Sequence, residues 1–239
     1  MTLLALWLAM LGLADLVRWR SDAGLLRQVL GGLVAVVSAV LAVLLGDLSA
    51  GPAGGVVLGL TALTAGWLVS SWWALHARGP AWLPLGLLGG GGLVLAASSG
   101  RTPDLRGELL GWYDGLEVPA AAGVGFDRFA VIAGGLLFLQ ATANVVVRLV
   151  LDSAGSPAED SESTLKGGRI LGPMERTFIF ALGVAGELTA ASIIVAAKGL
   201  LRFPELQRDK GSRVDALTEY FLVGSLTSWL LAVLLLPLT

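Results

Sequence analysis

Cysteine is absent from the 239-residue chain, and histidine occurs once, as His76. Without cysteine, disulfides, thiolate nucleophiles and cysteine-ligated zinc or iron–sulfur centres are excluded. A single histidine also excludes bis-histidine haem and multi-histidine zinc or copper sites. We therefore expect neither a metal site nor a cofactor.

Charged residues are scarce as well. They make up 14% of the chain, whereas a soluble domain carries roughly 25%. Hydrophobic residues make up 55% of the chain, and the mean hydropathy is +0.80. This balance argues against a soluble enzyme, a nucleic-acid-binding protein and a disordered chain. A membrane helix takes about 20 apolar residues, so the chain has room for several.

Seven apolar windows predict the membrane spans. Inside these windows only Asp15, Arg148 and Glu187 are charged, so almost all charges fall in the connections. We predict an all-α, polytopic transmembrane helix bundle of about seven spans, or six if the first or the sixth window does not cross. The windows are residues 3–17, 29–46, 54–75, 81–98, 129–149, 177–197 and 220–238.

We expect these spans to form a single transmembrane helical domain over residues 1–239. Its longest connection is the mixed-charge loop 99–127, in which 105–112 could form a short interfacial helix. Residues 153–166 are acidic, small and polar, which is typical of a flexible loop. Residues 199–216 alternate apolar and basic side chains, which predicts an amphipathic connection on the membrane surface.

The basic residues do not settle the orientation. With seven crossings and the N-terminus outside, the inside segments hold Arg18, Arg20, Arg27, Arg78, Arg148, Lys166, Arg169 and Arg176. The outside segments then hold Arg101, Arg106, Arg128, Lys198, Arg202, Arg208, Lys210 and Arg213. We favour an N-terminus outside the cell membrane because three arginines follow the first window. The equal number of basic residues on the two sides arises at the sixth window. This window either re-enters on the same side or keeps one basic cluster outside.

A polar stripe runs along the fifth window. Gln140, Asn144 and Arg148 are spaced by four residues, which places them on one face of a helix. Polar groups are costly in hydrocarbon, so the stripe should face other helices or water. We favour a role in holding helices together, where each such contact contributes roughly 0.6 kcal/mol.

The sixth window has Glu187 at its centre, among small residues that let another helix approach. If the fifth and sixth helices are antiparallel neighbours, equal depth predicts a Gln140–Glu187 hydrogen bond and an Arg148–Glu175 ion pair. A carboxyl group at mid-membrane is a candidate proton or cation site. The alternative is a protonated acid that makes one structural hydrogen bond. The predicted polar intramembrane site therefore consists of Glu187, Gln140, Asn144 and Arg148.

Two further features have structural interpretations. Asp15 and Arg18 are three residues apart at the end of the first window, which predicts a local ion pair or snorkelling at the interface. Glycines at positions 89–92 weaken the fourth helix, so that it either breaks along a cavity or packs tightly against a neighbour.

Three blocks in the last third of the chain carry a resemblance. They are GGRILGPMER at 167–176, AAKGLLRFPEL at 196–206 and TEYFLVGSLTS at 218–228. These blocks resemble the C-terminal part of a family of uncharacterised bacterial integral membrane proteins, in its G-R-x-I/L-G-x-x-E-R, A-A-K-x-x-x-R-F-x-E and E-Y-x-x-x-G-x-x-x-S patterns. The resemblance covers about a quarter of the chain. It implies a bacterial membrane location and no particular activity.

The same blocks predict a charged cluster at one membrane interface. Its residues could fix a helical hairpin, or they could form a site for an anion or an anionic lipid headgroup. The predicted cluster comprises Arg169, Glu175, Arg176, Lys198, Arg202 and Glu219.

Two functions remain open at this point. The first is transport or channel activity, with a polar centre between the fifth and sixth spans. The second is a non-catalytic membrane anchor or assembly component with a packed helical core. A lipid-modifying enzyme is less favoured, because no nucleophile–base pair or acidic metal pair is evident. We expect the bilayer, and either a membrane protein or a second copy of the chain, as partners, and no nucleic acid.

Overall fold

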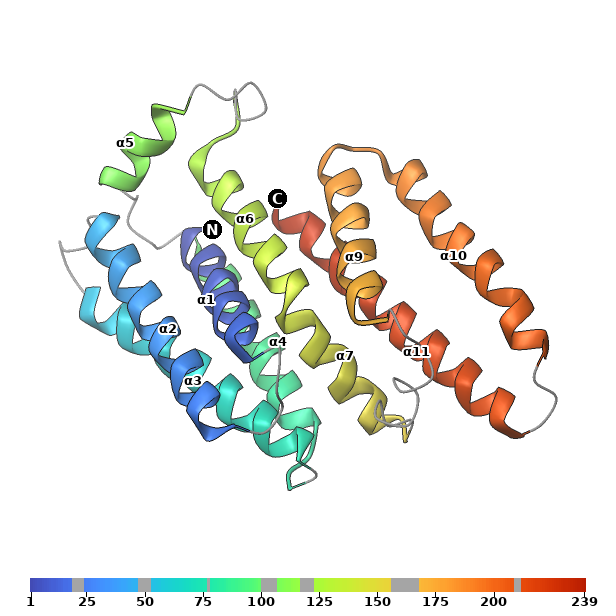
Figure 1. The fold of residues 1–239 in the computed structure, drawn as a ribbon. Coiled ribbons are helices and arrows are strands. Elements are labelled where there is room, and N and C mark those ends of the chain that lie inside the picture. Colours follow the sequence, from blue (N-terminus) through green and yellow to red (C-terminus); the bar gives the residue numbers. More distant parts are fainter. Residues whose placement is uncertain are drawn as a thin grey trace. The chain divides into compact units, whose positions relative to one another are not determined.

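The computed structural model describes residues 1–18, 24–46, 53–76, 78–99, 107–116, 123–155, 168–208 and 212–239. Across these ranges the chain forms ten α-helices and no strand (Figure 1). The helices divide into two compact units. Unit 1 comprises Met1–Thr142 with Leu238–Thr239, and unit 2 comprises Ala143–Pro237.

Unit 1 is built around its first helix. Helix α1 contacts α2, α3, α4 and α6. Several of its apolar side chains are deeply buried: Trp7, Met10 and Leu11 are each 1% exposed or less. The helices of unit 1 are α1 (Thr2–Arg18), α2 (Leu25–Leu45), α3 (Ala53–Leu75), α4 (Trp82–Ala97), α5 (Glu108–Asp114) and α6 (Phe126–Gln140).

Glycine allows α1 and α6 to pack backbone against backbone. A Cβ atom on Gly12 would overlap the backbone of Leu137, and one on Gly134 would overlap the carbonyl oxygen of Ala5. At the start of both helices, the hydroxyl of Thr2 donates a hydrogen bond of 2.7 Å to the Asp127 carboxylate. Helices α1 and α6 therefore run parallel.

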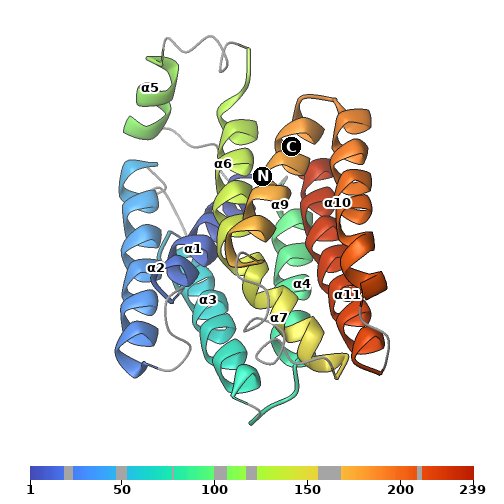
Figure 2. The same cartoon turned by 45° about the vertical axis from the view of Figure 1, so that its right-hand side comes forward.

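The remaining long helices of unit 1 alternate in direction. Gly31 of α2 faces the carbonyl of Ala14, and Gly66 of α3 faces the side chain of Leu87 in α4. Figure 2 shows α1, α2, α3 and α4 following one another in this alternating order. Helix α4 is continuous, and a Cβ on Gly91 would lie 3.0 Å from the Trp7 ring. Gly91 thus permits close packing against Trp7, and the broken-helix interpretation is wrong because α4 is continuous.

The described residues of unit 2 form four helices. Helix α9 contacts α10 and α11, and α10 also contacts α11. Helix α11 also packs against α7. A Cβ atom added to Gly224 of α11 would lie 3.6 Å from the side chain of Leu151 in α7. The helices are α7 (Thr142–Ser153), α9 (Gly168–Val184), α10 (Leu188–Arg208) and α11 (Ser212–Leu235), followed by a short 3-10 turn (Leu236–Leu238).

The predicted continuous helix over 177–197 is wrong. Helix α9 ends at Val184 and α10 begins at Leu188. Between them Gly186 takes a φ of +82°, a left-handed conformation that is cheap only for glycine. The N–H of Glu187 donates to the Leu182 carbonyl (2.8 Å) and that of Gly186 to the Gly183 carbonyl (3.0 Å). This hydrogen-bond pattern is a Schellman C-cap, which ends the helix and reverses the chain.

The hairpin formed by α9 and α10 turns back beside the end of α11. A Cβ on Gly183 would overlap the side chain of Leu236, so the turn is level with the C-terminal end of α11. Helix α10 then returns toward the beginning of α11, as Figure 1 shows. The sixth window is therefore a helical hairpin whose turn is level with the C-terminal end of α11.

The fifth window is also divided. Helix α6 ends at Gln140, and α7 begins at Thr142. Ala141 has φ −119° and ψ −62°, and its N–H still donates to the Leu137 carbonyl. Gln140 therefore does not share a continuous helix with Asn144 and Arg148, which removes it from the predicted stripe.

The predicted connections have mixed outcomes. Helix α5 occupies part of the 99–127 loop, slightly beyond the expected interfacial helix. The amphipathic connection at 199–216 is instead the end of α10 and the start of α11. Most of the acidic loop at 153–166 lies outside the described residues.

Three helical segments are long and apolar enough to cross a bilayer: Leu25–Leu45, Gly54–Leu75 and Phe221–Leu238. The divided pair α6 and α7 gives a fourth candidate. Hydroxyl groups inside such segments bond to their own helix, as when Thr64 donates to the Leu60 carbonyl at 2.8 Å. These features support a membrane location, whereas seven spans are not confirmed.

The α1–α6 contact gives a first prediction. Gly134→Ala should lower the free energy of unfolding by about 1–3 kcal/mol, because the new methyl group overlaps backbone in a packed core. Gly32→Ala in α2 is the control, since no atom lies within 4 Å of its added Cβ, and it should be neutral or slightly stabilising. Tryptophan fluorescence during unfolding in detergent measures both changes. Equal stability of the two variants would contradict the close contact.

Candidate functional site

A buried arginine connects three helices of unit 2. Arg176 in α9 is 2% exposed. Its Nη1 donates a hydrogen bond of 3.0 Å to the Ser228 hydroxyl in α11. Its Nη2 donates to the side-chain oxygen of Asn144 in α7. The guanidinium group therefore fixes α9 against both neighbours.

An ion pair links the fourth helix of unit 2, α10, to α9. Lys198 Nζ in α10 lies 2.5 Å from a carboxylate oxygen of Glu175 in α9. The same ammonium group lies over two aromatic rings of α11, 5.4 Å from the Phe221 centroid and 5.7 Å from the Trp229 centroid. Both rings present a negative face to the cation. Lys198 thus joins α9, α10 and α11.

We call the set Asn144, Glu175, Arg176, Lys198 and Ser228 the core charge cluster. Its depth can be judged against α11, whose apolar segment is Phe221–Leu238. Ser228 lies near the middle of that segment. The Arg176 guanidinium bonded to it is therefore level with the middle of that apolar segment.

Glu187 lies elsewhere. It is exposed and directly precedes α10, where its carbonyl accepts a hydrogen bond of 3.1 Å from the N–H of Ala191. The turn that contains it is level with the end of α11. The expectation that Glu187 lies at the middle of a continuous helix is wrong, because the chain reverses at Gly186. The predicted Gln140–Glu187 hydrogen bond assumed a continuous helix through Glu187, so equal depth no longer supports it.

The local sequence explains how Arg176 fits into the core. Gly172 lies one turn earlier in α9, and a Cβ there would be 3.8 Å from Arg176 Nη1. Pro173 lies inside the helix, and its carbonyl accepts a hydrogen bond of 2.9 Å from the Thr177 hydroxyl. The small residue leaves space for the guanidinium group. Threonine satisfies a helix carbonyl inside an apolar environment.

The structure brings together part of both predicted sites. Asn144, Glu175, Arg176 and Lys198 meet in one cluster, although they were assigned to two. Arg148 was the expected partner of Glu175, but the carboxylate binds Lys198 instead. The side chains of the remaining members lie outside the described part: Arg169, Arg202 and Glu219.

Sequence reasoning missed Ser228 as a partner of Arg176. Ser228 lies four residues after Gly224 in the last apolar window, so the two small residues share one face of a helix. A hydroxyl on such a face is the available signal, because a small polar side chain leaves room for a donor from the next helix.

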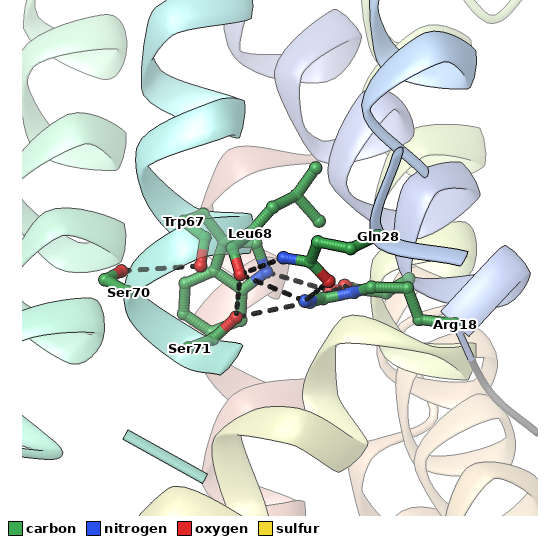
Figure 3. Close-up of polar contacts among 7 residues, drawn as sticks. Arg18, Gln28, Trp67, Leu68, Ser70 and Ser71 are labelled. Carbon is green, nitrogen blue, oxygen red and sulfur yellow. Dashed lines mark hydrogen bonds and ion pairs between the residues drawn. The ribbon is translucent and has the colours of Figure 1, made fainter. Parts of the chain in front are cut away.

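A second polar cluster holds the helices of unit 1 together (Figure 3). The buried Asp15 carboxylate binds Arg18, as predicted from their spacing. Its other oxygen accepts a hydrogen bond of 2.9 Å from Trp67 Nε1 in α3. Because Trp67 is fully buried, this bond satisfies both groups away from water.

Arg18 extends the second cluster to α2 and α3. It donates to the Gln28 side chain at 3.1 Å, to the Leu68 carbonyl at 3.2 Å and to the Ser71 hydroxyl at 3.2 Å. Gln28 also donates to the Leu68 carbonyl at 2.5 Å. These long-range partners were not predicted, because sequence spacing reveals only contacts within one helix.

No group of three or more potential metal ligands occurs among the described residues. No family model, curated protein or solved structure matches the chain. The resemblance of the C-terminal blocks to bacterial membrane proteins therefore stays a prediction. Inference about function rests on the contacts in the two units.

The ion pair gives a second prediction. Glu175→Gln or Lys198→Met alone should destabilise the protein by about 3–5 kcal/mol, because each leaves a buried charge without its partner. The double variant should lose less than the sum of the two. Unfolding in detergent measures the cycle, with the exposed Ser192→Ala as the control. Additive losses would show that the two groups do not interact.

Proposed function

We propose that the protein is a non-catalytic integral membrane component, an anchor or assembly element with a packed helical core. The observation that carries this proposal is the core charge cluster. Arg176 and Glu175 are 2% and 7% exposed, and their contacts with Asn144, Ser228 and Lys198 join one helix to another. Such groups are positioned to hold helices rather than to meet a diffusing substrate.

The low dielectric of a bilayer supports this role. A charge near mid-membrane is costly, so it persists only where other groups bind it. Once bound, it penalises every arrangement that separates it from its partners. The core charge cluster thus favours one register of α7, α9, α10 and α11. This is the best-attested use of buried ionic groups in proteins.

The helical hairpin also supports one orientation of the protein in the membrane. If α9 and α10 each cross beside α11, the chain returns to the side from which α9 started. The basic residues toward the end of α10 and beyond it then join the inside group: Arg202, Arg208, Lys210 and Arg213. Only Arg101, Arg106 and Arg128 remain outside, so the equal division becomes a strong positive-inside bias with the N-terminus outside.

Unit 1 supports the same path. Because α1 and α6 run in the same direction, an odd number of membrane crossings must lie between them along the chain. Helices α2, α3 and α4 provide three, in alternating directions. Under this proposal α1 runs inward, and the end of α1 at Arg18 faces the cytoplasm.

Labelling with single cysteines tests this topology, since the chain has no cysteine of its own. Asp160→Cys and Lys210→Cys should react with an impermeant maleimide from the same side of the membrane. Asp104→Cys and Glu187→Cys should react from the opposite side. Reaction of positions 160 and 210 from opposite sides, or a Glu187→Cys that reacts from neither side, would refute the topology.

Transport is the second candidate, because Arg176 is level with the middle of the apolar segment of α11. Proteoliposomes separate it from the structural role. Under our proposal, Arg176→Gln should lower the free energy of unfolding by about 2–4 kcal/mol, while fluxes of protons, sodium and chloride stay at the protein-free level.

The exposed Arg128→Gln is the control for that experiment and should leave stability unchanged. A flux through the wild-type protein that Arg176→Gln abolishes without loss of stability would establish transport and overturn the proposed role.

A further inference from the structure

Two buried hydrogen-bond donors at one end of unit 1 have no partner. They are Nη1 of Arg27 and Nε1 of Trp72. Arg27 lies in the first turn of α2, and Trp72 lies in the last turn of α3. The Gln28–Leu68 hydrogen bond places these two turns at the same end of the unit.

The surroundings of these donors are cationic. Arg78 follows α3, is exposed, and has its guanidinium carbon 5.6 Å from the centre of the Trp72 ring. The described acid at this end is Asp15, which already binds Arg18 and Trp67. The described acids at the opposite end of unit 1 are Glu108, Asp114 and Asp127.

We propose that this end of unit 1 binds the phosphate group of a phospholipid headgroup through Arg27, Trp72 and Arg78. A phosphate offers several strong acceptor oxygens to donors that otherwise stay unsatisfied. Arginine suits it because the planar guanidinium group can donate two parallel hydrogen bonds. The inference does not depend on the role of the core charge cluster.

The position favours a lipid over a free anion. Tryptophan and arginine at helix ends lie at headgroup depth, and α2 and α3 are both candidate membrane spans. Val29 and Leu33, which follow Arg27 toward the middle of α2, are 60% and 56% exposed. These side chains could contact the acyl chains of the lipid whose phosphate Arg27 binds.

Native mass spectrometry of the full-length protein tests the site. Titrations would use phosphatidylglycerol, phosphatidylcholine and diacylglycerol, which lacks phosphate. We expect one retained phospholipid per chain and no retained diacylglycerol. Equal retention of diacylglycerol would overturn the proposal, because acyl contacts alone would then explain binding. Inorganic phosphate is added separately, and displacement of the lipid by it at millimolar concentration would assign the same site to a free anion.

Variants identify the donors. Arg27→Gln with Arg78→Gln should weaken phosphatidylglycerol binding about tenfold or more, and Trp72→Phe should weaken it several-fold by removing one N–H. Arg27→Lys keeps the charge, so it covers the case in which the double variant fails to fold, and should weaken binding less. Arg128→Gln, an exposed arginine at the opposite end, is the matched control. Unchanged binding by folded Arg27 and Trp72 variants would refute the site.

Discussion

The Arg176 guanidinium group constrains the C-terminal half of the protein more than any apolar contact does. It is nearly inaccessible to solvent and carries a charge that hydrocarbon cannot solvate. Its bonds to Asn144 and Ser228 come from two other helices, so neither helix can slide without leaving donors unsatisfied. Gly172 and Ser228 are small because the guanidinium group occupies the space next to them.

The reversal at Gly186 is the second constraint, and the core charge cluster requires it. Lys198 reaches Glu175 because α10 runs back along α9. A continuous helix would separate these residues by 23 positions, or roughly 35 Å. The hairpin therefore converts two charges that are distant in sequence into an ion pair. It also explains why basic residues flank both ends of the sixth apolar window.

Hydropathy predicts where helices occur in this chain but not where they stop. The windows at 29–46, 54–75 and 81–98 match α2, α3 and α4 closely, because each is bounded by charged residues, glycine or proline. The window at 177–197 fails because an apolar average ignores backbone conformation. Gly183 and Gly186 were interpreted as packing positions, whereas Gly186 supplies a left-handed cap. At Ala141 nothing in the residue itself indicates a break.

In the two polar clusters, too, some contacts were predictable from the sequence and others were not. The Asp15–Arg18 pair was predictable because both residues lie on one turn of a helix. Trp67, Gln28 and Ser71 were not, since their contacts depend on how α2 and α3 pack beside α1. Likewise, Asn144 and Arg176 were both identified as important without being connected to each other. Polar residues in apolar segments are thus visible in a sequence, while their partners follow from the arrangement of helices.

Both units satisfy buried charge with aromatic residues as well as with opposite charge. In unit 1 the Trp67 N–H binds Asp15, and in unit 2 the faces of Phe221 and Trp229 lie under Lys198. An indole can serve either sign, because its N–H is a donor and its ring face attracts cations. Aromatic rings also remain compatible with hydrocarbon, which a third charged residue would not. A bundle with few charges can therefore hold some of them beside tryptophan or phenylalanine, as it holds Asp15 and Lys198.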